Sequence, residues 1–400
     1  MESYMSRAEL VAMARKNIAH VEAGTADQEA ACFSVPTANY TDPDLWQLEV
    51  DKIFKRVPLM VALGGELTEP GSYKAMTAVG VPILLTRDTE GAIKAFVNMC
   101  SHRGAIVVPD GLGKARRFSC PYHGWTYDGA GQLVGITNRA EFGAPDEGEL
   151  GLVPLPAEER AGMIFVGLTP GSDLHLDDFL AGYDRVLTHF NFDGWHLVTR
   201  REIVGPNWKL AYDGYLDYYH LPILHRKTFG PDGSNKAIYN VWGPHQRMSR
   251  PDPTLLELKN IPEDDWDIDA TVGGVWTIFP NVSMAIYRGK SILLSQLFPG
   301  PTPDLSTTVQ SYFLAEPPED EEAAAKAEKH ADFLAMVVRD EDYSTGFGIQ
   351  TAISTGAKQS FVFGRNEGGG HRFHSWVERL INTDDQELGS ILASGRAAAH

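Results

Sequence analysis

"NMCSHRGA" (residues 98–105) and "FSCPYHGWTYD" (residues 118–128) each carry one cysteine and one histidine within a few residues of each other. Cysteine and histidine are common ligands of transition metals. A glycine lies just beyond each histidine, where the backbone must turn closely around a bound group. The two segments therefore predict one metal site with four ligands, Cys100, His102, Cys120 and His123.

The order of these ligands separates two kinds of metal site. Structural zinc accepts cysteine and histidine in tetrahedral geometry, but zinc fingers group the cysteines on one loop and the histidines on the other. Here each loop has one of each. That order suits a Rieske-type 2Fe–2S cluster, in which one iron takes both thiolates and the other takes both imidazoles. Zinc is the alternative that the residues alone leave open.

Length and composition narrow the class of protein further. The chain has 400 residues, of which 43% are hydrophobic and only 3 are cysteine. It is long enough for two or three structural units and forms no disulfide framework. Lys and Arg total 35 and Asp and Glu total 53, so the net charge is 35 − 53 = −18. This charge argues against nucleic acid or an anionic membrane as the partner. No long apolar run or apolar signal core is present, so we expect a cytoplasmic protein.

The pattern along the chain predicts an α+β fold. From about residue 58 to 166, short β-prone runs alternate with Gly, Asp and Pro turns, which is typical of a small all-β unit. Residues 273–315 predict antiparallel strands of a larger sheet flanked by helices. We expect helices at about 7–22, 43–55, 169–190, 207–221, 317–347 and 371–382.

"LDYYHLPILH" (residues 216–225) places two histidines on either side of a proline. In a regular α-helix, residues five apart point about 140° away from each other, so His220 and His225 would not share one metal ion. Pro222 lacks an amide hydrogen and its ring clashes with the carbonyl of Tyr218. We therefore expect the helix to end or kink near residue 221, which lets His225 fold back toward His220. Two histidines and one carboxylate are the Fe(II) ligands of non-haem iron oxygenases.

The motifs together resemble a known family. "CSHRGA" with "CPYHGWTYD" is similar to the cluster-binding motif of the Rieske non-haem iron oxygenases. The pattern D-x(2)-H-x(4)-H resembles the iron-binding segment of their ring-hydroxylating α subunits. Further similar segments spread the resemblance over most of residues 45–380: "NWKL" at 207–210, "FPN" at 279–281 and "HRFHSWVERL" at 371–380.

This resemblance implies roles for particular residues. His220 and His225 correspond to the histidines that bind mononuclear Fe(II). Asp217 corresponds to an aspartate that is not an iron ligand but links the iron site to a Rieske histidine, His102 or His123, of a neighbouring subunit. Many relatives carry Glu-Asn where this chain has Tyr212 and Asp213, so details of the pocket near the iron do not transfer.

The third iron ligand must be a distant carboxylate. "VVRDEDYSTGFGIQTAI" (residues 337–353) resembles the family's late segment, in which a Glu-Asp pair precedes a glutamine by eight residues. Asp342 and Gln350 keep that spacing, so we assign Asp342 as the ligand, with Asp340 and Glu341 as alternatives.

The resemblance also implies a domain organisation and an activity. We expect an N-terminal helical segment (1–45) that packs on the catalytic domain, a Rieske 2Fe–2S domain (46–168) and a catalytic domain with mononuclear iron (169–400). The activity would be that of a terminal oxygenase, a homotrimer with or without a β subunit. It would use O2 and electrons from NAD(P)H, delivered by a ferredoxin or reductase, to mono- or cis-dihydroxylate a substrate.

The substrate and two rival functions stay open. Trp276, Phe279, Met284 and Phe347 are candidate pocket residues and suggest a hydrophobic aromatic or polycyclic substrate. One rival function is that of a Rieske electron carrier or redox sensor without catalytic iron, and the other is a zinc-stabilised binding protein. The pair His371 and His374 is too short a pattern to predict a metal site and favours packing on a helix.

Overall fold

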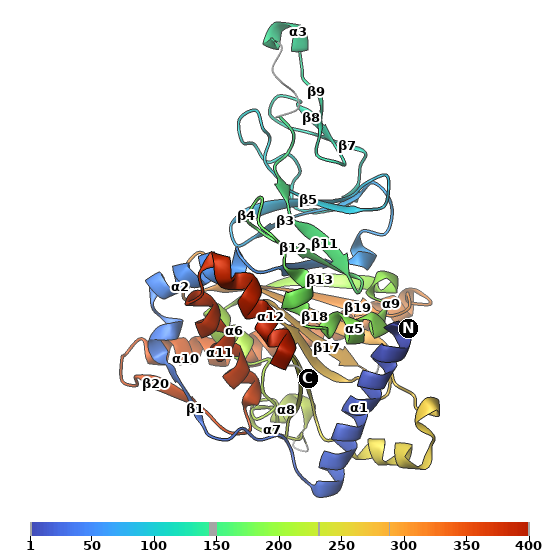
Figure 1. Cartoon of the computed structure of the whole chain (residues 1–400), viewed down its shortest axis with the longest axis vertical. Coiled ribbons are helices and arrows are strands. Elements are labelled where there is room, and N and C mark those ends of the chain that lie inside the picture. Colours follow the sequence, from blue (N-terminus) through green and yellow to red (C-terminus); the bar gives the residue numbers. More distant parts are fainter. Residues whose placement is uncertain (1, 144–149, 231–232, 288, 399–400) are drawn as a thin grey trace. The chain divides into compact units, whose positions relative to one another are not determined.

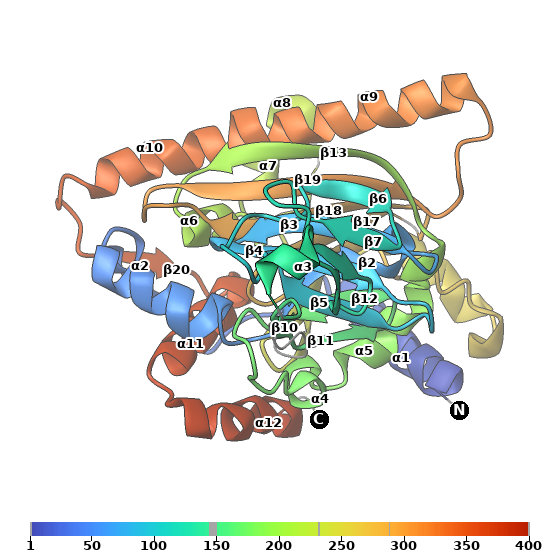
Figure 2. The same ribbon diagram turned by 90° about the horizontal axis from the view of Figure 1, so that it is seen from above.

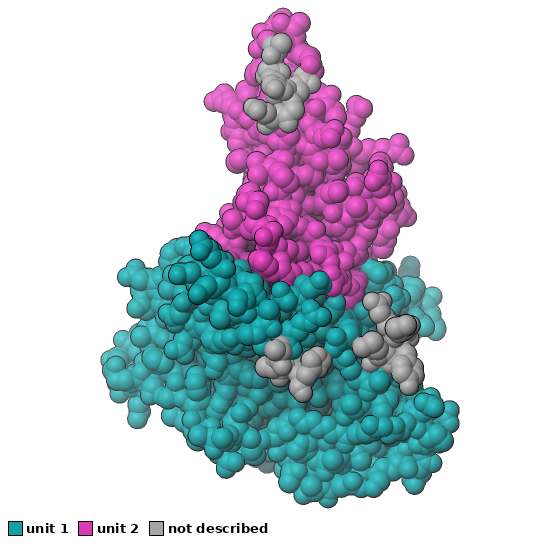
Figure 3. All heavy atoms as spheres, in the orientation of Figure 1, with its two compact units in different colours: residues 1–53, 177–400 teal, residues 54–176 magenta. Residues whose placement is uncertain are grey.

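The computed structural model describes residues 2–143, 150–230, 233–287 and 289–398. The chain folds into two compact units, Met1–Ile53 with Asp177–His400, and Phe54–Leu176 (Figure 3). These bounds lie within about ten residues of the domain limits expected from the sequence; the functional domain limits themselves stay a prediction. None of the described helices is long and apolar enough to cross a membrane.

The unit Phe54–Leu176 is built from short antiparallel strands in three small sheets. Its sheet orders are β10-β5-β4-β3-β6, β11-β12-β2 and β7-β8-β9. The strands are β2 (Leu59–Leu63), β3 (Ser72–Ala78), β4 (Val81–Arg87), β5 (Ile93–Val97), β6 (Gly111–Lys114), β7 (Arg117–Ser119), β8 (Thr126–Asp128), β9 (Leu133–Gly135), β10 (Pro154–Leu155), β11 (Ala157–Arg160) and β12 (Met163–Val166), with one short helix, α3 (Arg139–Phe142). The small all-β unit is confirmed.

The larger unit contains a seven-stranded antiparallel sheet in the order β13-β19-β18-β17-β16-β15-β14. Strands β13, β17, β18 and β19 of this sheet are labelled in Figure 1. Its strands are β13 (His196–Gly205), β14 (Ile238–Trp242), β15 (His245–Ser249), β16 (Gly274–Ile278), β17 (Val282–Tyr287), β18 (Ser291–Pro299) and β19 (Ser306–Leu314). A separate two-stranded sheet pairs β1 (Phe33–Pro36) with β20 (Ser360–Phe363). The expected antiparallel strands within 273–315 are thus β16 to β19.

Helices flank this sheet. They are α1 (Glu2–Ala23), α2 (Pro43–Glu49), α4 (Leu176–Leu180), α5 (Tyr183–Leu187), α6 (Trp208–Asp213), α7 (Leu221–Leu224), α8 (Arg226–Phe229), α9 (Glu321–Val337), α10 (Ser344–Ile353), α11 (Gly368–Ile381) and α12 (Leu388–Ala398). The helix expected at 43–55 is α2 continued by a π-helical turn, Val50–Phe54. Sequence reasoning missed α12, because Gly389 and Gly395 are weak helix formers.

The two faces of the sheet bury different elements, because successive side chains of a strand point to opposite faces. On one face, Tyr183 of α5 stacks on Trp242 and Trp276. On the other face, Leu293 and other strand residues pack against Leu334 of α9. Figure 2 shows α9 and α10 running along this sheet beside β13. The second face also carries the candidate iron site.

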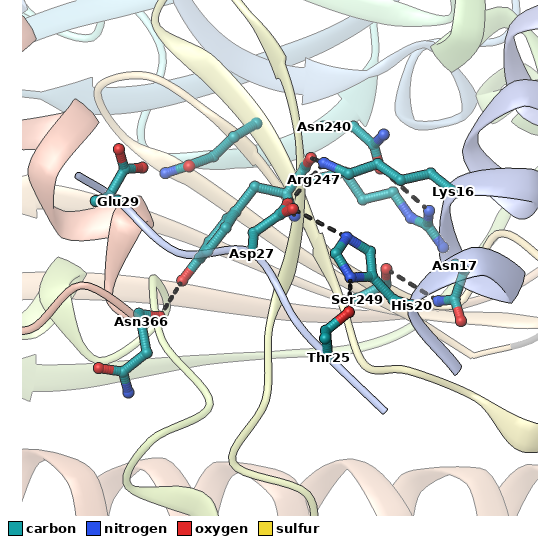
Figure 4. Close-up of polar contacts among 12 residues, drawn as sticks. Lys16, Asn17, His20, Thr25, Asp27, Glu29, Asn240, Arg247, Ser249 and Asn366 are labelled. Atoms are coloured by element: carbon teal, nitrogen blue, oxygen red, sulfur yellow. Dashed lines mark hydrogen bonds and ion pairs between the residues drawn. The ribbon is translucent and has the colours of Figure 1, made fainter. Parts of the chain in front are cut away.

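The N-terminal helix α1 is tied to the sheet by polar contacts (Figure 4). His20 lies between Thr25 and Asp27, with its ring nitrogens 3.0 Å from an oxygen of each. Asp27 also accepts a hydrogen bond from Lys16 (2.6 Å), which donates to the backbone carbonyl of Tyr239 in β14 (2.7 Å). These contacts make α1 and the segment after it part of the larger unit.

Candidate metal centres and active site

The segment 207–225 folds differently from the expected long helix. Helix α6 ends at Asp213, and the amides of Tyr215 and Leu216 bond to carbonyls three residues back. The Leu216 carbonyl then accepts a hydrogen bond from the buried Tyr239 hydroxyl (3.3 Å). It also lies so close to Gly369 of α11 that a Cβ there would be 2.2 Å from it. The helix predicted over 207–221 is therefore wrong beyond Asp213, because these tertiary contacts override its local helix preference.

The two histidines flank one short helix. His220 is the residue before α7 and His225 is the residue after it, and their ring centroids are 5.1 Å apart. Pro222 is near the start of α7, where a missing amide hydrogen costs nothing because that position has no partner inside the helix. The expected convergence of the two rings is observed. The role inferred for Pro222 is wrong, since it begins a turn rather than breaking a long helix.

Helix α6 is anchored by a buried ion pair. Lys209 and Glu49 are at most 1% exposed and bond to each other, and Trp208 donates to the same carboxylate (2.8 Å). Removing one partner of such a pair typically costs about 3–5 kcal/mol, because the other charge is left buried alone. The "NWKL" segment therefore fixes the base of the loop that carries the histidines.

Asp342 reaches the same point from a distant element. It lies in a π-helical turn, Val338–Tyr343, between α9 and α10. Its Oδ1 is 3.1 Å from His225 Nε2 and 3.7 Å from His220 Nε2. Among the described residues this is the only group of three or more His, Cys, Asp or Glu residues whose ligand atoms lie within 4.8 Å of one another. Turns of this kind often occur at functional sites.

The geometry separates the three carboxylates that the sequence left as candidates. Asp340 is exposed and pairs with its neighbour Arg339 (2.6 Å). Glu341 approaches the other nitrogen of the His225 ring, Nδ1, at 2.6 Å. Only Asp342 lies close to Nε2 of both histidines, which favours it as the ligand.

The residues present fit a mononuclear iron. His220 Nδ1 is 3.0 Å from Asp217 Oδ1, so both imidazoles have a carboxylate at Nδ1. A neutral imidazole that donates from Nδ1 keeps its lone pair on Nε2, the nitrogen that faces Asp342 in both rings. Two such nitrogens and one carboxylate oxygen form the facial set that binds non-haem Fe(II).

The surroundings of His225 raise its pKa above the ordinary value of 6.5. Burial alone would lower this pKa, but hydrogen bonds and charge interactions with Asp342 and Glu341 outweigh it. A histidine must be unprotonated to bind a metal ion, so protons and iron compete for His225. Because this pKa is raised, protons begin to compete with iron for His225 at a higher pH than they would for a histidine with the ordinary pKa.

We therefore expect the affinity of the mononuclear site for Fe(II) to fall on acidification, as His225 becomes protonated. The measurement is iron retained after gel filtration between about pH 8 and about pH 5, with the visible absorbance of the 2Fe–2S cluster as an internal control. Iron retention that did not fall anywhere in this pH range would contradict this assignment.

An apolar cavity of about 130 Å³ adjoins the three candidate ligands. Its walls include Phe229, Val275, Tyr287, Leu293, Leu334 and Val337. None of the four pocket residues suggested by the sequence lines it. Trp276 and Met284 are cross-strand neighbours, and Trp276 packs under α5 on the opposite face of the sheet from Val275. A sequence pattern cannot tell which face of a fully buried strand will meet the cavity.

The two loops of the smaller unit have matching backbone structures. The amide of Gly104 bonds to the Cys100 carbonyl (2.8 Å), and the amide of Gly124 bonds to the Cys120 carbonyl (2.9 Å). Both glycines have positive φ, +76° and +71°, which a side chain would strain. The loops that hold the two cysteines are thus repeated turns that only glycine fits comfortably.

The four candidate cluster ligands lie in one region of the smaller unit, since both cysteines share a buried core with Trp125, on which the His102 ring stacks. Both cysteines are buried, and the rings of His102 and His123 are 4.6 Å apart between centroids. The hydroxyl of Tyr127 is 3.2 Å from Cys100 Sγ. Within the described part of the chain, the buried Nδ1 atom of His102 has no hydrogen-bond partner. An orphaned imidazole nitrogen beside two buried thiols fits ligation of a Rieske 2Fe–2S cluster.

The remaining histidine pair serves packing. His371 Nε2 is 2.9 Å from the Gly364 carbonyl, and His374 Nε2 is 2.9 Å from Asp213. Asp213 also accepts from the buried Tyr40 hydroxyl (2.9 Å). Asp213 is thus engaged inside the larger unit.

Comparisons with known proteins agree with this architecture. Residues 58–152 match the Rieske [2Fe-2S] domain, and residues 192–383 match the catalytic domain of the ring-hydroxylating α subunits. The chain is 33% identical over 196 residues to the glycine betaine monooxygenase oxygenase subunit of Chromohalobacter salexigens, covering 48% of this chain and 43% of the relative. It is 32% identical over 188 residues to chlorobenzene dioxygenase subunit alpha of a Cupriavidus species, covering 45% and 42%. The matches thus span less than half the length of these relatives.

The fold is shared with a solved structure. The crystal structure of the quaternary ammonium Rieske monooxygenase CntA with L-carnitine has a TM-score of 0.74 at 21% identity, covering 89% of this chain and 97% of that one. The fold and the two matching domains are those of the Rieske non-haem iron oxygenases. The chain belongs to the ring-hydroxylating oxygenase α-subunit family. Members carry a Rieske 2Fe–2S cluster and a mononuclear iron, and both sets of residues fit these cofactors.

Proposed function

We propose that the protein is the terminal oxygenase of a multicomponent system. It would use O2 and electrons from NAD(P)H, delivered by a ferredoxin or reductase, to hydroxylate a hydrophobic substrate. The observation that carries the proposal is the group His220, His225 and Asp342 at the wall of an apolar cavity, in a chain that also has a Rieske domain. A simple electron carrier would need neither the cavity nor these three ligands.

The site residues have distinct tasks in this proposal. Bound iron would supply O2 activation, which no side chain of the chain can perform. Asp342 and the two imidazoles would hold the metal at the wall of the cavity. Asp217 fixes the ring of His220 through Nδ1. The apolar walls would hold a carbon centre near the open positions and exclude water.

The residues that line the cavity favour an uncharged ring compound, aromatic or polycyclic, as the substrate. Its walls are mostly aliphatic and aromatic, and no lysine or arginine is among the described residues that line it. A substrate with a carboxylate, such as betaine or carnitine, would therefore find no cation there to pair with. Tyr215, Tyr218 and Tyr287 also line the cavity. Such rings attract quaternary ammonium groups, so choline is the alternative substrate class.

We further propose that the working enzyme is a homotrimer, with or without a β subunit, in which Asp217 links neighbouring subunits. Asp217 uses a single oxygen, Oδ1, for both of its hydrogen bonds to His220. Its side chain is 19% exposed, so its second oxygen is available to a donor outside the chain. The adjacent Tyr219 and Ile223 are apolar and exposed (55% and 79%), which favours a covered surface there.

Turnover of the purified oxygenase with a reductase system tests the proposed function. We expect fused-ring aromatic compounds to be oxidised with one or two atoms of label from ¹⁸O2, read by product mass and stereochemistry. Choline and glycine betaine should give no product. Exclusive oxidation of the ammonium compounds would refute the substrate class, and cluster oxidation without any labelled product would support the electron-carrier alternative.

A further inference from the structure

His225 is held at both of its ring nitrogens by neighbouring residues of one turn. Asp342 Oδ1 is 3.1 Å from Nε2, and Glu341 Oε2 is 2.6 Å from Nδ1. The side chain of His225 is only 3% exposed, so water cannot replace either partner easily. The ring therefore lies between two adjacent carboxylates of the π-helical turn Val338–Tyr343.

Glu341 is itself fixed by a second contact. The hydroxyl of Thr228 donates to its other oxygen, Oε1. Thr228 belongs to α8, which begins directly after His225. Glu341 thus bonds twice to the segment that carries the histidine, once at the ring and once three residues further on. This pair of contacts joins that segment to the turn that supplies the third candidate iron ligand.

The two histidines are supported in different ways. The Nδ1 atom of His220 is held by Asp217, which lies three residues earlier in the same loop. The Nδ1 atom of His225 is held by Glu341, which is 116 residues away in sequence. Only the second contact spans the two chain segments that must meet for the site to form. Without Glu341, the distance between His225 and Asp342 would therefore be less well fixed. The orientation of the His225 ring would be less well fixed too.

We propose that Glu341 is a positioning residue for the mononuclear iron. It sets the tautomer and orientation of His225 and ties the histidine segment to Asp342. This inference rests on the proposed function, since it assumes that His220, His225 and Asp342 bind iron. Carboxylates that hold the far nitrogen of a metal-binding histidine typically contribute about 10- to 100-fold in metal affinity or activity.

The test measures metal binding by the full-length protein with its 2Fe–2S cluster intact. The mononuclear site is emptied by a chelator and titrated with Fe(II), and with Co(II) for its visible spectrum. We expect Glu341→Ala to weaken Fe(II) binding by about 10- to 100-fold and to change the Co(II) spectrum. Glu341→Gln should recover part of the affinity, because its amide oxygen still accepts from Nδ1. Thr228→Val should give a smaller loss in the same direction.

The matched control is Asp340→Ala, which removes a carboxylate from the same turn. Asp340 is exposed and paired with Arg339, so its removal should leave Fe(II) affinity and the Co(II) spectrum unchanged. Cluster absorbance and the thermal unfolding midpoint show whether each variant is folded. If Glu341→Ala does not fold, the Fe(II) affinity and the Co(II) spectrum of Glu341→Gln and Thr228→Val are compared with those of the unmodified protein instead.

Two failures can be told apart. Unchanged affinity and spectrum in the folded Glu341 variants would overturn the positioning role and leave the proposed function intact. Absence of Fe(II) binding in the unmodified protein would instead overturn the proposed function on which this inference rests.

Discussion

Replacing His220 by alanine should remove one of three irons and abolish turnover. Within the described part of the chain, His220 is one of three groups offered to the mononuclear iron, and two remaining ligands would hold it poorly. The 2Fe–2S cluster depends on residues of the other compact unit, so its two irons, two labile sulfides and visible spectrum should persist. The measurement is iron and acid-labile sulfide per chain, together with product formation.

The control for this variant is His189→Ala. The two histidine side chains are similarly exposed, 24% for His220 and 25% for His189, and His189 also lies close to an aspartate, Asp269 (2.8 Å). His189 lies away from the candidate ligands, so its removal should keep all three irons. If His220→Ala retained the full iron content and turnover, the mononuclear site would have to lie elsewhere.

Replacing Asp217 by asparagine should leave both metal centres in place and lower turnover by about 10- to 100-fold. Asparagine keeps an oxygen that can accept from His220, so the iron ligands should stay oriented. It lacks the negative charge that would stabilise a proton donor from a neighbouring subunit during electron transfer. The measurement is the rate at which the pre-reduced cluster is reoxidised by O2 in the presence of substrate, followed by its visible absorbance.

Asp340→Asn provides the comparison for Asp217→Asn, since it neutralises a nearby carboxylate that touches neither histidine. It should reoxidise its cluster at the unmodified rate. An Asp217→Asn variant that matched it in both rate and product yield would remove Asp217 from the electron route. Loss of iron in Asp217→Asn would show instead that Asp217 serves mainly to hold His220.

The sequence predicted the parts of this protein that depend on short-range chemistry. Cys100, His102, Cys120 and His123 lie in two local turns, and the glycines that close those turns are visible in the sequence. The all-β unit and the strands β16 to β19 also follow from local patterns of alternation and turn residues. Family membership could be inferred from these motifs together with the spacing of His220 and His225.

Local patterns failed where tertiary contacts decide the backbone. The residues after Asp213 are compatible with a helix, yet the Leu216 carbonyl is taken by Tyr239 and approached by Gly369. Helix α12 was missed because its glycines disfavour a helix, although Gly395 packs closely on Trp376. In both places packing contributes more than the intrinsic preference of the residues.

The sequence by itself determined the kind of chemistry: a Rieske cluster motif, two histidines and a late acidic segment. It could not determine which of three consecutive acids, Asp340, Glu341 and Asp342, binds iron, because that depends on the direction of each side chain around a π-helical turn. Only the tertiary structure brings this turn to the histidines, more than a hundred residues away. In this turn Asp340 pairs with Arg339, and Glu341 contacts Nδ1 of His225. Asp342 lies close to Nε2 of both histidines.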